Sequence, residues 1–162
     1  MKIGILGFQG AVIEHQRHIE QLGQEAVVVR YTEQLAEIDG IILPGGESTT
    51  MGKLLNRTGM MPVWGTCAGM ILLAKELDQD PVVHLGMMDI TVRRNAYGTQ
   101  IDSFDTQVVI PEVSDEQIPL VFIRAPYIVR TGERVKVLCE VERHVVAARE
   151  KNMLATSFHP EL

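Results

Sequence analysis

The first 43 residues alternate apolar runs with segments of helical spacing, and this alternation constrains the fold more than any other feature. The apolar runs cover residues 2–7, 26–29 and 40–43, and the last is uninterrupted, as is typical of a strand covered on both faces. Between them lie a helical pattern over residues 11–22, built on Val12, Ile19 and Leu22 and closed by Gly23, and a shorter one around Leu35 and Ile38. Successive β–α units predict a parallel sheet.

The second half of the chain is richer in predicted strands, which short turns separate. These strands cover residues 90–92, 107–110, 120–123, 135–138 and 145–148. We therefore expect a three-layer α/β/α sandwich, flavodoxin-like, with a mostly parallel central sheet and an antiparallel β extension in the second half. Without a repeat or a linker-like stretch, residues 1–162 are predicted to form a single domain.

Composition narrows the class of partner and the compartment. The 162 residues carry a formal charge of −6 and no basic run, so no nucleic-acid partner is expected. Two cysteines are too few for a disulfide framework, no apolar run is long enough to span a bilayer, and the first residues do not resemble a signal peptide. The expected location is a reducing cytoplasm, with no membrane partner.

A cysteine lies between glycines where a predicted strand turns into a helix. The apolar run from Pro62 to Trp64 leads into Gly-Thr-Cys-Ala-Gly, residues 65–69, and the segment from Met70 to Lys75 looks helical. A nucleophile elbow needs glycine there, because the tight turn brings neighbouring backbone too close for a Cβ atom. The helix N-terminus favours the thiolate of Cys67, which is its reactive form.

Two further segments offer what a nucleophilic thiol needs. The loop at residues 44–50 has paired glycines, Gly45 and Gly46, after a strand. By itself this pattern is more typical of a plain capped turn, but together with Cys67 it favours an oxyanion hole formed by the backbone N–H groups of the loop. Near the C-terminus, Pro160 favours an extended His159, so that Glu161, two residues on, faces the same side as the imidazole. Cys67, His159 and Glu161 would then act as nucleophile, base and orienting carboxylate.

Together these motifs resemble class I glutamine amidotransferases. Three more segments, at residues 7–12, 94–98 and 122–126, extend the resemblance over the whole chain to the glutaminase subunits of pyridoxal 5′-phosphate synthase. The resemblance implies hydrolysis of L-glutamine to glutamate and ammonia through a cysteine thioester. It also implies a synthase subunit as partner in a large hetero-oligomer that receives the ammonia, with no cofactor and no metal.

The resemblance also implies roles for individual residues. Backbone N–H groups of Gly46 and Ala68 would form the oxyanion hole. The residues implied in glutamine binding are Gly46, Glu47, Ser48, Arg94, Ile123 and Arg124. An arginine fork suits the α-carboxylate, and Glu47 suits the ammonium group. Gln9, in the loop after the first strand, is predicted to touch the active site or the partner.

The chain departs from the family pattern at two places. Between Met61 and Pro62 the family usually carries an additional stretch, and after Leu162 it continues into a helix. Neither departure removes Cys67, His159 or Glu161.

Other conspicuous residues have structural interpretations. Cys139 and the methionines, including Met60, Met61, Met87 and Met88, are predicted to fill the core. His15 and His18 are expected at the surface of their helix and not at a metal site, His84 and His144 show no ligand spacing, and Arg93 is expected to be a solvated surface residue.

The residues leave three alternatives open. The chain could be a cysteine hydrolase or amidotransferase of another pathway on the same fold. It could be a redox sensor that uses Cys67 without needing His159 or Glu161. It could also be a structural partner in a larger complex, for which Cys67 is dispensable.

Overall fold

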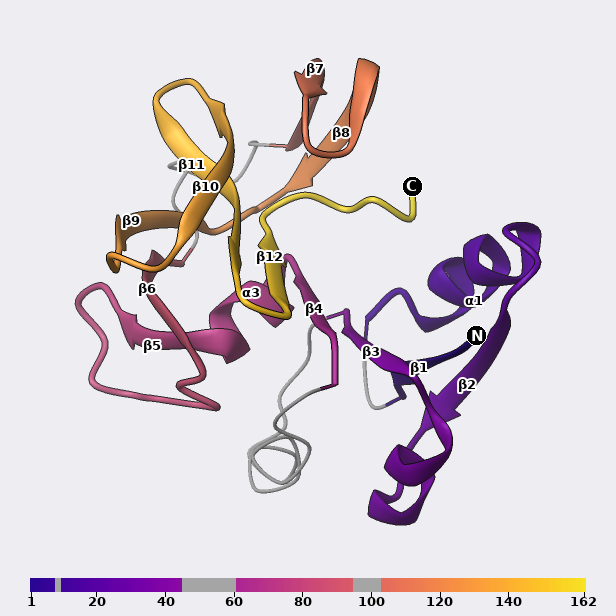
Figure 1. Ribbon diagram of the computed structural model, residues 1–162. Coiled ribbons are helices and arrows are strands. Elements are labelled where there is room, and N and C mark those ends of the chain that lie inside the picture. The colour runs from indigo at the N-terminus through magenta and orange to yellow at the C-terminus, as the bar shows by residue number, and fades with distance from the viewer. Residues whose placement is uncertain (8–9, 45–60, 95–102) are drawn as a thin grey trace.

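The structure, a computed structural model, describes residues 1–7, 10–44, 61–94 and 103–162. Five parallel strands form one half of its large sheet, in the order β2-β1-β3-β4-β12. Their bounds are Lys2–Leu6 for β1, Glu25–Val29 for β2, Gly40–Leu43 for β3, Val63–Thr66 for β4 and Met153–Thr156 for β12. The last strand of the described chain thus lies beside the strand that leads to Cys67 (Figure 1).

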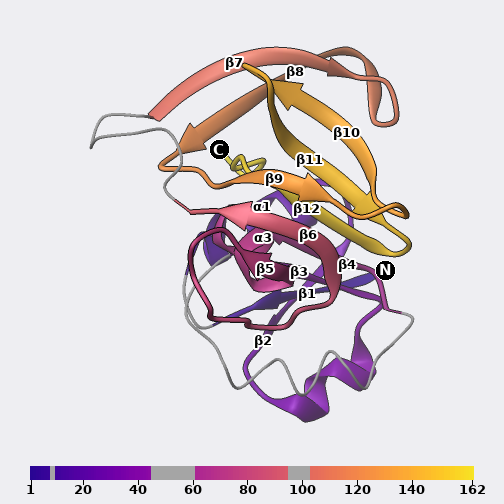
Figure 2. The ribbon, with the colours of Figure 1, turned by 90° about the vertical axis from the view of Figure 1, so that its left-hand side faces the viewer.

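The other half of the sheet is largely antiparallel. It continues from β12 through β11 (His144–Glu150), β9 (Tyr127–Thr131) and β6 (Met88–Arg93) to β5 (Ala74–Leu77), and β10 (Lys136–Val141) pairs with β11. Only β5 and β6 run parallel here. A separate hairpin of β7 (Ser103–Ile110) and β8 (Ser114–Ile123) lies beyond β10 and β11, at the opposite end of the molecule from β2 (Figure 2). The fold is therefore mixed α/β, with a mostly parallel central sheet and added antiparallel strands.

Helical segments cover both faces of the parallel half. Helix α1 (Val12–Gln21) packs Ile19 against Ile5 and Ile42 on one face. The 3-10 helix η1 (Thr32–Glu37) and the short helix α3 (Ala68–Leu73) pack on the other face, where Met70 lies in one core with Leu43. Burial on both sides explains why β3 is apolar at every position.

A further core joins the β7–β8 hairpin to the sheet. Phe122 of β8 is fully buried, stacks on Phe104 at 4.6 Å and meets the edge of Phe158 at 5.9 Å. Cys139 lies in this core, as the sequence predicts, and so fills space as a small apolar residue. Met88 is likewise fully buried, in agreement with its predicted core role.

The structure corrects three details of the predicted elements. The helix after Cys67 ends at Leu73, and Ala74 and Lys75 belong to β5, because their backbone pairs with β6. Leu22, predicted on the apolar stripe of α1, is 76% exposed, since the helix ends before it and Gly23 turns the chain away with φ of +71°. Strands β5, β9 and β12 were not predicted from the sequence.

Within the described ranges, no helix is both long and apolar enough to cross a membrane.

Candidate active site

Cys67 lies at the junction of β4 and α3, in a strained backbone conformation. Its φ of 47° and ψ of −108° are unusual for a residue with a side chain, and such strain is typical of functional turns. The N–H group of Cys67 donates to the carbonyl of Thr156 at 2.8 Å, and its own carbonyl accepts from Met70 at 3.1 Å. Cys67 is partly exposed and is a free thiol. The arrangement is that of a nucleophile elbow.

The flanking glycines are required by close backbone contacts. A Cβ atom at Gly69 would lie 1.9 Å from the carbonyl oxygen of Leu43, and one at Gly65 would lie 2.5 Å from the carbonyl oxygen of Gly69. These distances are far below van der Waals contact, and both obstacles are backbone atoms that cannot rotate away. The sequence-based reason for glycine at both positions is therefore confirmed.

His159 reaches the same edge of the sheet because β12 pairs in parallel with β4. Thr156 is in register with Thr66, so the segments that follow the two strands begin side by side. Ser157 then donates its N–H group to Val146, and His159 donates its N–H group to Val121 of β8, both at 2.8 Å. Backbone hydrogen bonds to two other strands thus hold the residues on each side of buried Phe158.

His159 and Glu161 form a close pair. The Nδ1 atom of His159 lies 2.7 Å from Oε1 of Glu161, whose side chain is fully buried. Interaction with the Cys67 side chain, followed by the hydrogen bond to Glu161, raises the pKa of His159 to about 10, while burial opposes this rise. The protonated imidazole is therefore favoured between the thiol and the carboxylate.

Burial alone would favour the neutral carboxyl group of Glu161. The hydrogen bond from His159, a backbone hydrogen bond and the charge of His159 outweigh burial, so the pKa of Glu161 lies below its ordinary value. Glu161 is then an ionised hydrogen-bond acceptor at neutral pH. That is the state needed to orient an imidazole.

His15 of α1 lies on the far side of Glu161, and the sequence-based expectation of a surface position is wrong for it. The residue is only 3% exposed, and its Nε2 atom lies 3.4 Å from Oε2 of Glu161. Its position on the helix carries the missed signal, since residue 15 falls on the same stripe as Val12 and Ile19. His18, one turn further on, is exposed as expected.

The family of the chain follows from its sequence over nearly its whole length. The profile of the SNO glutamine amidotransferase family matches residues 5–162. The chain belongs to this family. The resemblance inferred from the separate motifs is thereby confirmed.

Curated relatives of this SNO-family chain are subunits of pyridoxal 5′-phosphate synthase. The synthase subunit PdxT of Clostridium acetobutylicum is 54% identical, with 100% of the chain and 93% of the relative covered, and that of Clostridium kluyveri is 56% identical, with 100% and 92% covered. Each alignment spans 173 positions, so it contains positions that the relatives fill and this chain does not.

Solved structures support the same family and fold. A crystal structure described as a glutamine amidotransferase is 40% identical in sequence and superposes with a TM-score of 0.86. The match covers 98% of this chain and 90% of the chain in that structure. The structure of PurLQS from Thermotoga maritima, only 15% identical, covers 99% and 87% with a TM-score of 0.72 and shows likeness of fold alone.

The structure describes only some of the other residues that the family resemblance implicates in the site. Ala68 is the first residue of α3, where a backbone N–H group has no partner within the helix. Ile123 ends β8 and Arg124 follows it with φ of 45°, two and three residues after the carbonyl that accepts from His159. Arg94 is half exposed and lies 3.4 Å from Asp80. Gln9, Gly46, Glu47 and Ser48 lie outside the described residues, as do Gly45 and Met60.

Arg93, next to Arg94, is more tightly held than the sequence predicts. Its guanidinium group pairs with Asp78 and donates to the hydroxyl of Tyr127 at 3.1 Å. The hydrogen bond to Asp78 raises the pKa of Arg93. Arg93 therefore has a structural partner and is not simply a solvated surface residue.

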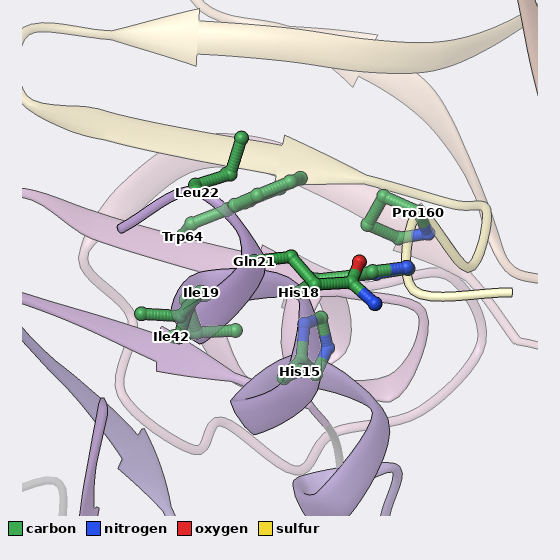
Figure 3. A pocket seen from close by; sticks show the side chains of 8 residues that line it. All are labelled: His15, His18, Ile19, Gln21, Leu22, Ile42, Trp64 and Pro160. Carbon is green, nitrogen blue, oxygen red and sulfur yellow. The ribbon is translucent and has the colours of Figure 1, made fainter. Parts of the chain in front are cut away.

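A cavity of about 290 Å³ lies beside α1 in this SNO-family fold (Figure 3). Its walls are largely apolar, and His15 and Pro160 border it from α1 and from the C-terminal segment. Cys67, His159 and Glu161 are not among the residues that line it, so this cavity is not the space in front of the thiol. Among the described residues, no cluster of three or more histidines, cysteines or carboxylates could hold a metal ion.

Proposed function

We propose that Cys67, His159 and Glu161 hydrolyse the side-chain amide of L-glutamine in this chain. The chain is a glutaminase subunit that supplies ammonia for pyridoxal 5′-phosphate synthesis, as its family and its relatives at about 50% identity indicate. The observation that supports the catalytic assignment best is the partly exposed Cys67 on a strained turn, interacting with a histidine that Glu161 holds at 2.7 Å.

The first half of the reaction forms a thioester. His159 already holds the proton of Cys67, as its raised pKa favours, and the thiolate attacks the side-chain amide carbon of glutamine. The resulting oxyanion accepts hydrogen bonds from the backbone N–H groups of Gly46 and Ala68. The carbon–nitrogen bond then breaks, and His159 returns its proton to the departing ammonia.

The second half releases glutamate. A water molecule gives a proton to His159 as it attacks the thioester carbon, and the carbon–sulfur bond breaks to restore Cys67. Glu161 stabilises the imidazolium in both halves without taking its proton. Loss of one oxyanion donor typically costs about 2.7–4 kcal/mol of transition-state stabilisation, so the geometry of the Gly46 loop is critical.

The substrate's charged ends are assigned to residues around this centre. Arg94 or Arg124 would bind the α-carboxylate, because a guanidinium fork can hold both oxygens. Glu47 would bind the ammonium group, while Gly46, Ser48 and Ile123 complete the pocket. The position of Arg124 just beyond the contact between β8 and His159 supports its share in this role.

The partner is a synthase subunit that receives the ammonia within a large hetero-oligomer. We place the chain in the cytoplasm, where a reducing environment suits the free thiols of Cys67 and Cys139. Residues 1–162 act as one amidotransferase domain, a three-layer and flavodoxin-like sandwich in its parallel half. The positions of α1 on one face and of η1 and α3 on the other support this description.

The experiment is ammonia release from L-glutamine by this chain, alone and with its cognate synthase subunit. We expect turnover to rise when the synthase is added, because docking would shift the oxyanion loop toward its active conformation. Glutamine should then replace added ammonium salt in pyridoxal phosphate formation. Equal turnover with and without the synthase would refute activation by docking, and absence of ammonia in both would refute the function.

A further inference from the structure

His15 is a buried polar side chain that the triad mechanism does not use. It comes from the middle of α1, and its Nε2 atom faces Glu161 of the C-terminal segment. That segment runs from β12 toward α1 (Figure 1). The side chains of His15 and Glu161 are 4% and 0% exposed, and Nε2 of His15 lies 3.4 Å from Oε2 of Glu161. Among the described residues, neither of these two buried atoms makes a hydrogen bond, to the other or to any other group.

The two oxygens of Glu161 therefore face different histidines. Oε1 faces His159 at 2.7 Å, and Oε2 faces His15. A buried carboxylate needs a donor at each oxygen to stay ionised and to keep one orientation. The separation of 3.4 Å is longer than a well-formed hydrogen bond, but catalytic hydrogen bonds are often long before substrate binds and shorten in the complex.

The ring of His15 is held in place by the strand that leads to Cys67. Trp64 of β4 meets it edge-on, with ring centres 6.5 Å apart and planes at 67°. Trp64 is itself fixed by a hydrogen bond from its indole Nε1 to the hydroxyl of Thr156 at 3.1 Å. Figure 3 shows His15 and Trp64 together with Pro160, which comes directly before Glu161 in the chain.

The protonation state of His15 follows from its surroundings. Burial lowers its pKa, and the negative charge of Glu161 offsets this only in part. The other charged or titratable groups that act on it are Glu14 and His18 of its own helix and His159 of the C-terminal segment. His15 is thus neutral at pH 7 and carries one ring proton. That proton must be on Nε2, since a bare nitrogen facing a carboxylate oxygen would be repelled.

We propose that His15 is a positioning residue, which donates its Nε2 proton to Oε2 of Glu161 and so fixes the carboxylate that orients His159. The proposal rests on the function proposed above for Cys67, His159 and Glu161. His15 touches neither the thiol nor the site of the amide carbon, and it acts only through Glu161. The orienting unit is then a histidine–glutamate–histidine series that links α1 to the C-terminal segment.

The test compares two substitutions at residue 15 in the complex with the synthase subunit. His15→Leu removes the donor at similar size, whereas His15→Gln keeps an N–H donor. For His15→Leu we expect kcat for glutamine to fall about 10-fold, a loss typical of outer hydrogen-bond partners of functional side chains, with KM within about 2-fold. The acidic limb of the plot of kcat against pH should move to higher pH, because loss of the donor would raise the pKa of Glu161.

A variant that restores the donor distinguishes a positioning role of His15 from a packing role. His15→Gln should recover most of the lost kcat and of the pH shift, while the matched control His18→Leu, on the same helix but exposed, should leave both unchanged. If His15→Leu does not fold, His15→Met takes its place, since it also lacks a donor but adapts its shape. Wild-type kcat and pH profile in the donor-free variant, or equal losses in that variant and in His15→Gln, would overturn the proposal.

Two further variants distinguish failure of this proposal from failure of the proposed function. Cys67→Ala and Glu161→Gln should both lose glutaminase activity. If either retains full activity, the triad itself is refuted. If both are inactive while His15→Leu behaves as wild type, the triad stands and only the role of His15 is refuted.

Discussion

At the scale of single residues, the site is set by backbone contacts that leave no space for side chains. Gly69 approaches the carbonyl of Leu43 so closely that α3 can follow β4 directly, and this junction holds Cys67 at φ of 47°. Backbone strain of this kind costs roughly 1–3 kcal/mol and persists only where the surroundings enforce it. The neighbouring strands β3 and β12 supply that enforcement through Leu43 and through the hydrogen bond from Cys67 to Thr156.

The substitution Gly69→Ala tests this close contact. The new Cβ atom would lie 1.9 Å from the carbonyl oxygen of Leu43, so α3 or β3 must move. We expect the free energy of unfolding to fall by about 3 kcal/mol or more and glutaminase activity to be lost, as urea denaturation and an ammonia assay would show.

The matched control is Gly40→Ala, where the nearest atom is 3.4 Å from the new Cβ atom. This variant should stay close to wild type in stability. Equal stability of the two variants would contradict the explanation given for Gly69.

The pKa of His159 gives a second prediction at this scale. The ring should be protonated at neutral pH and should titrate far above the ordinary value of 6.5, near the value of about 10 given by its surroundings. Because Cys67 contributes the largest share, Cys67→Ala should lower this pKa more than Glu161→Gln does. A pH titration followed by nitrogen NMR of the histidine rings measures the pKa of His159 in the wild type and in both variants. A His159 that titrates near 6.5 in the wild type would show that the pairing is wrong.

At the scale of elements, the parallel pair of β4 and β12 brings together residues 92 positions apart in sequence. Cys67 follows one strand and His159 follows close behind the other, with Thr66 and Thr156 in register. The β7–β8 hairpin then contributes Val121, whose carbonyl accepts from the N–H group of His159. His159 is thus held by a hairpin that is outside the main sheet.

Phe158→Ala tests this attachment. The side chain is buried in the core that joins the hairpin to the sheet, and its ring makes a T-shaped contact with Phe122. Removing it should cost about 3–5 kcal/mol of stability and also lower kcat, because the segment carrying His159 loses its anchor. Urea denaturation and the ammonia assay report the two effects, and Val113→Ala at an exposed turn is the control. Wild-type kcat in a destabilised Phe158→Ala would show that the anchor does not position His159.

At the scale of the whole molecule, the sequence was sufficient for the class of fold and for the family. Local periodicity marked β1 and β3 and the helix α1, because their apolar residues face cores on one or both sides. The strand β12 escaped prediction, since its four residues Met-Leu-Ala-Thr carry no local signal and are strand only through pairing with β4 and β11. Ala74 and Lys75 looked helical for the same reason, because tertiary pairing overrides local propensity.

The residues of the candidate site likewise fall into those that the sequence predicted and those that depend on tertiary contacts. Cys67, Gly65 and Gly69 were predictable because the turn itself dictates glycine. The pairing of His159 with Glu161 was predicted from an extended segment, but the structure brings the two side chains together through a turn at residues 160 and 161. His15 was not predicted, since its partner Glu161 is almost the whole chain away. Only the position of His15 on the buried stripe of α1 pointed inward.

The most direct test of the central claim is the rate of ammonia release from L-glutamine by Cys67→Ala, relative to wild type, with the synthase subunit present. Loss of at least about 10³-fold is expected, because the thioester cannot form without the thiol. Retention of the wild-type rate in a folded Cys67→Ala would contradict the assignment of Cys67 as the nucleophile.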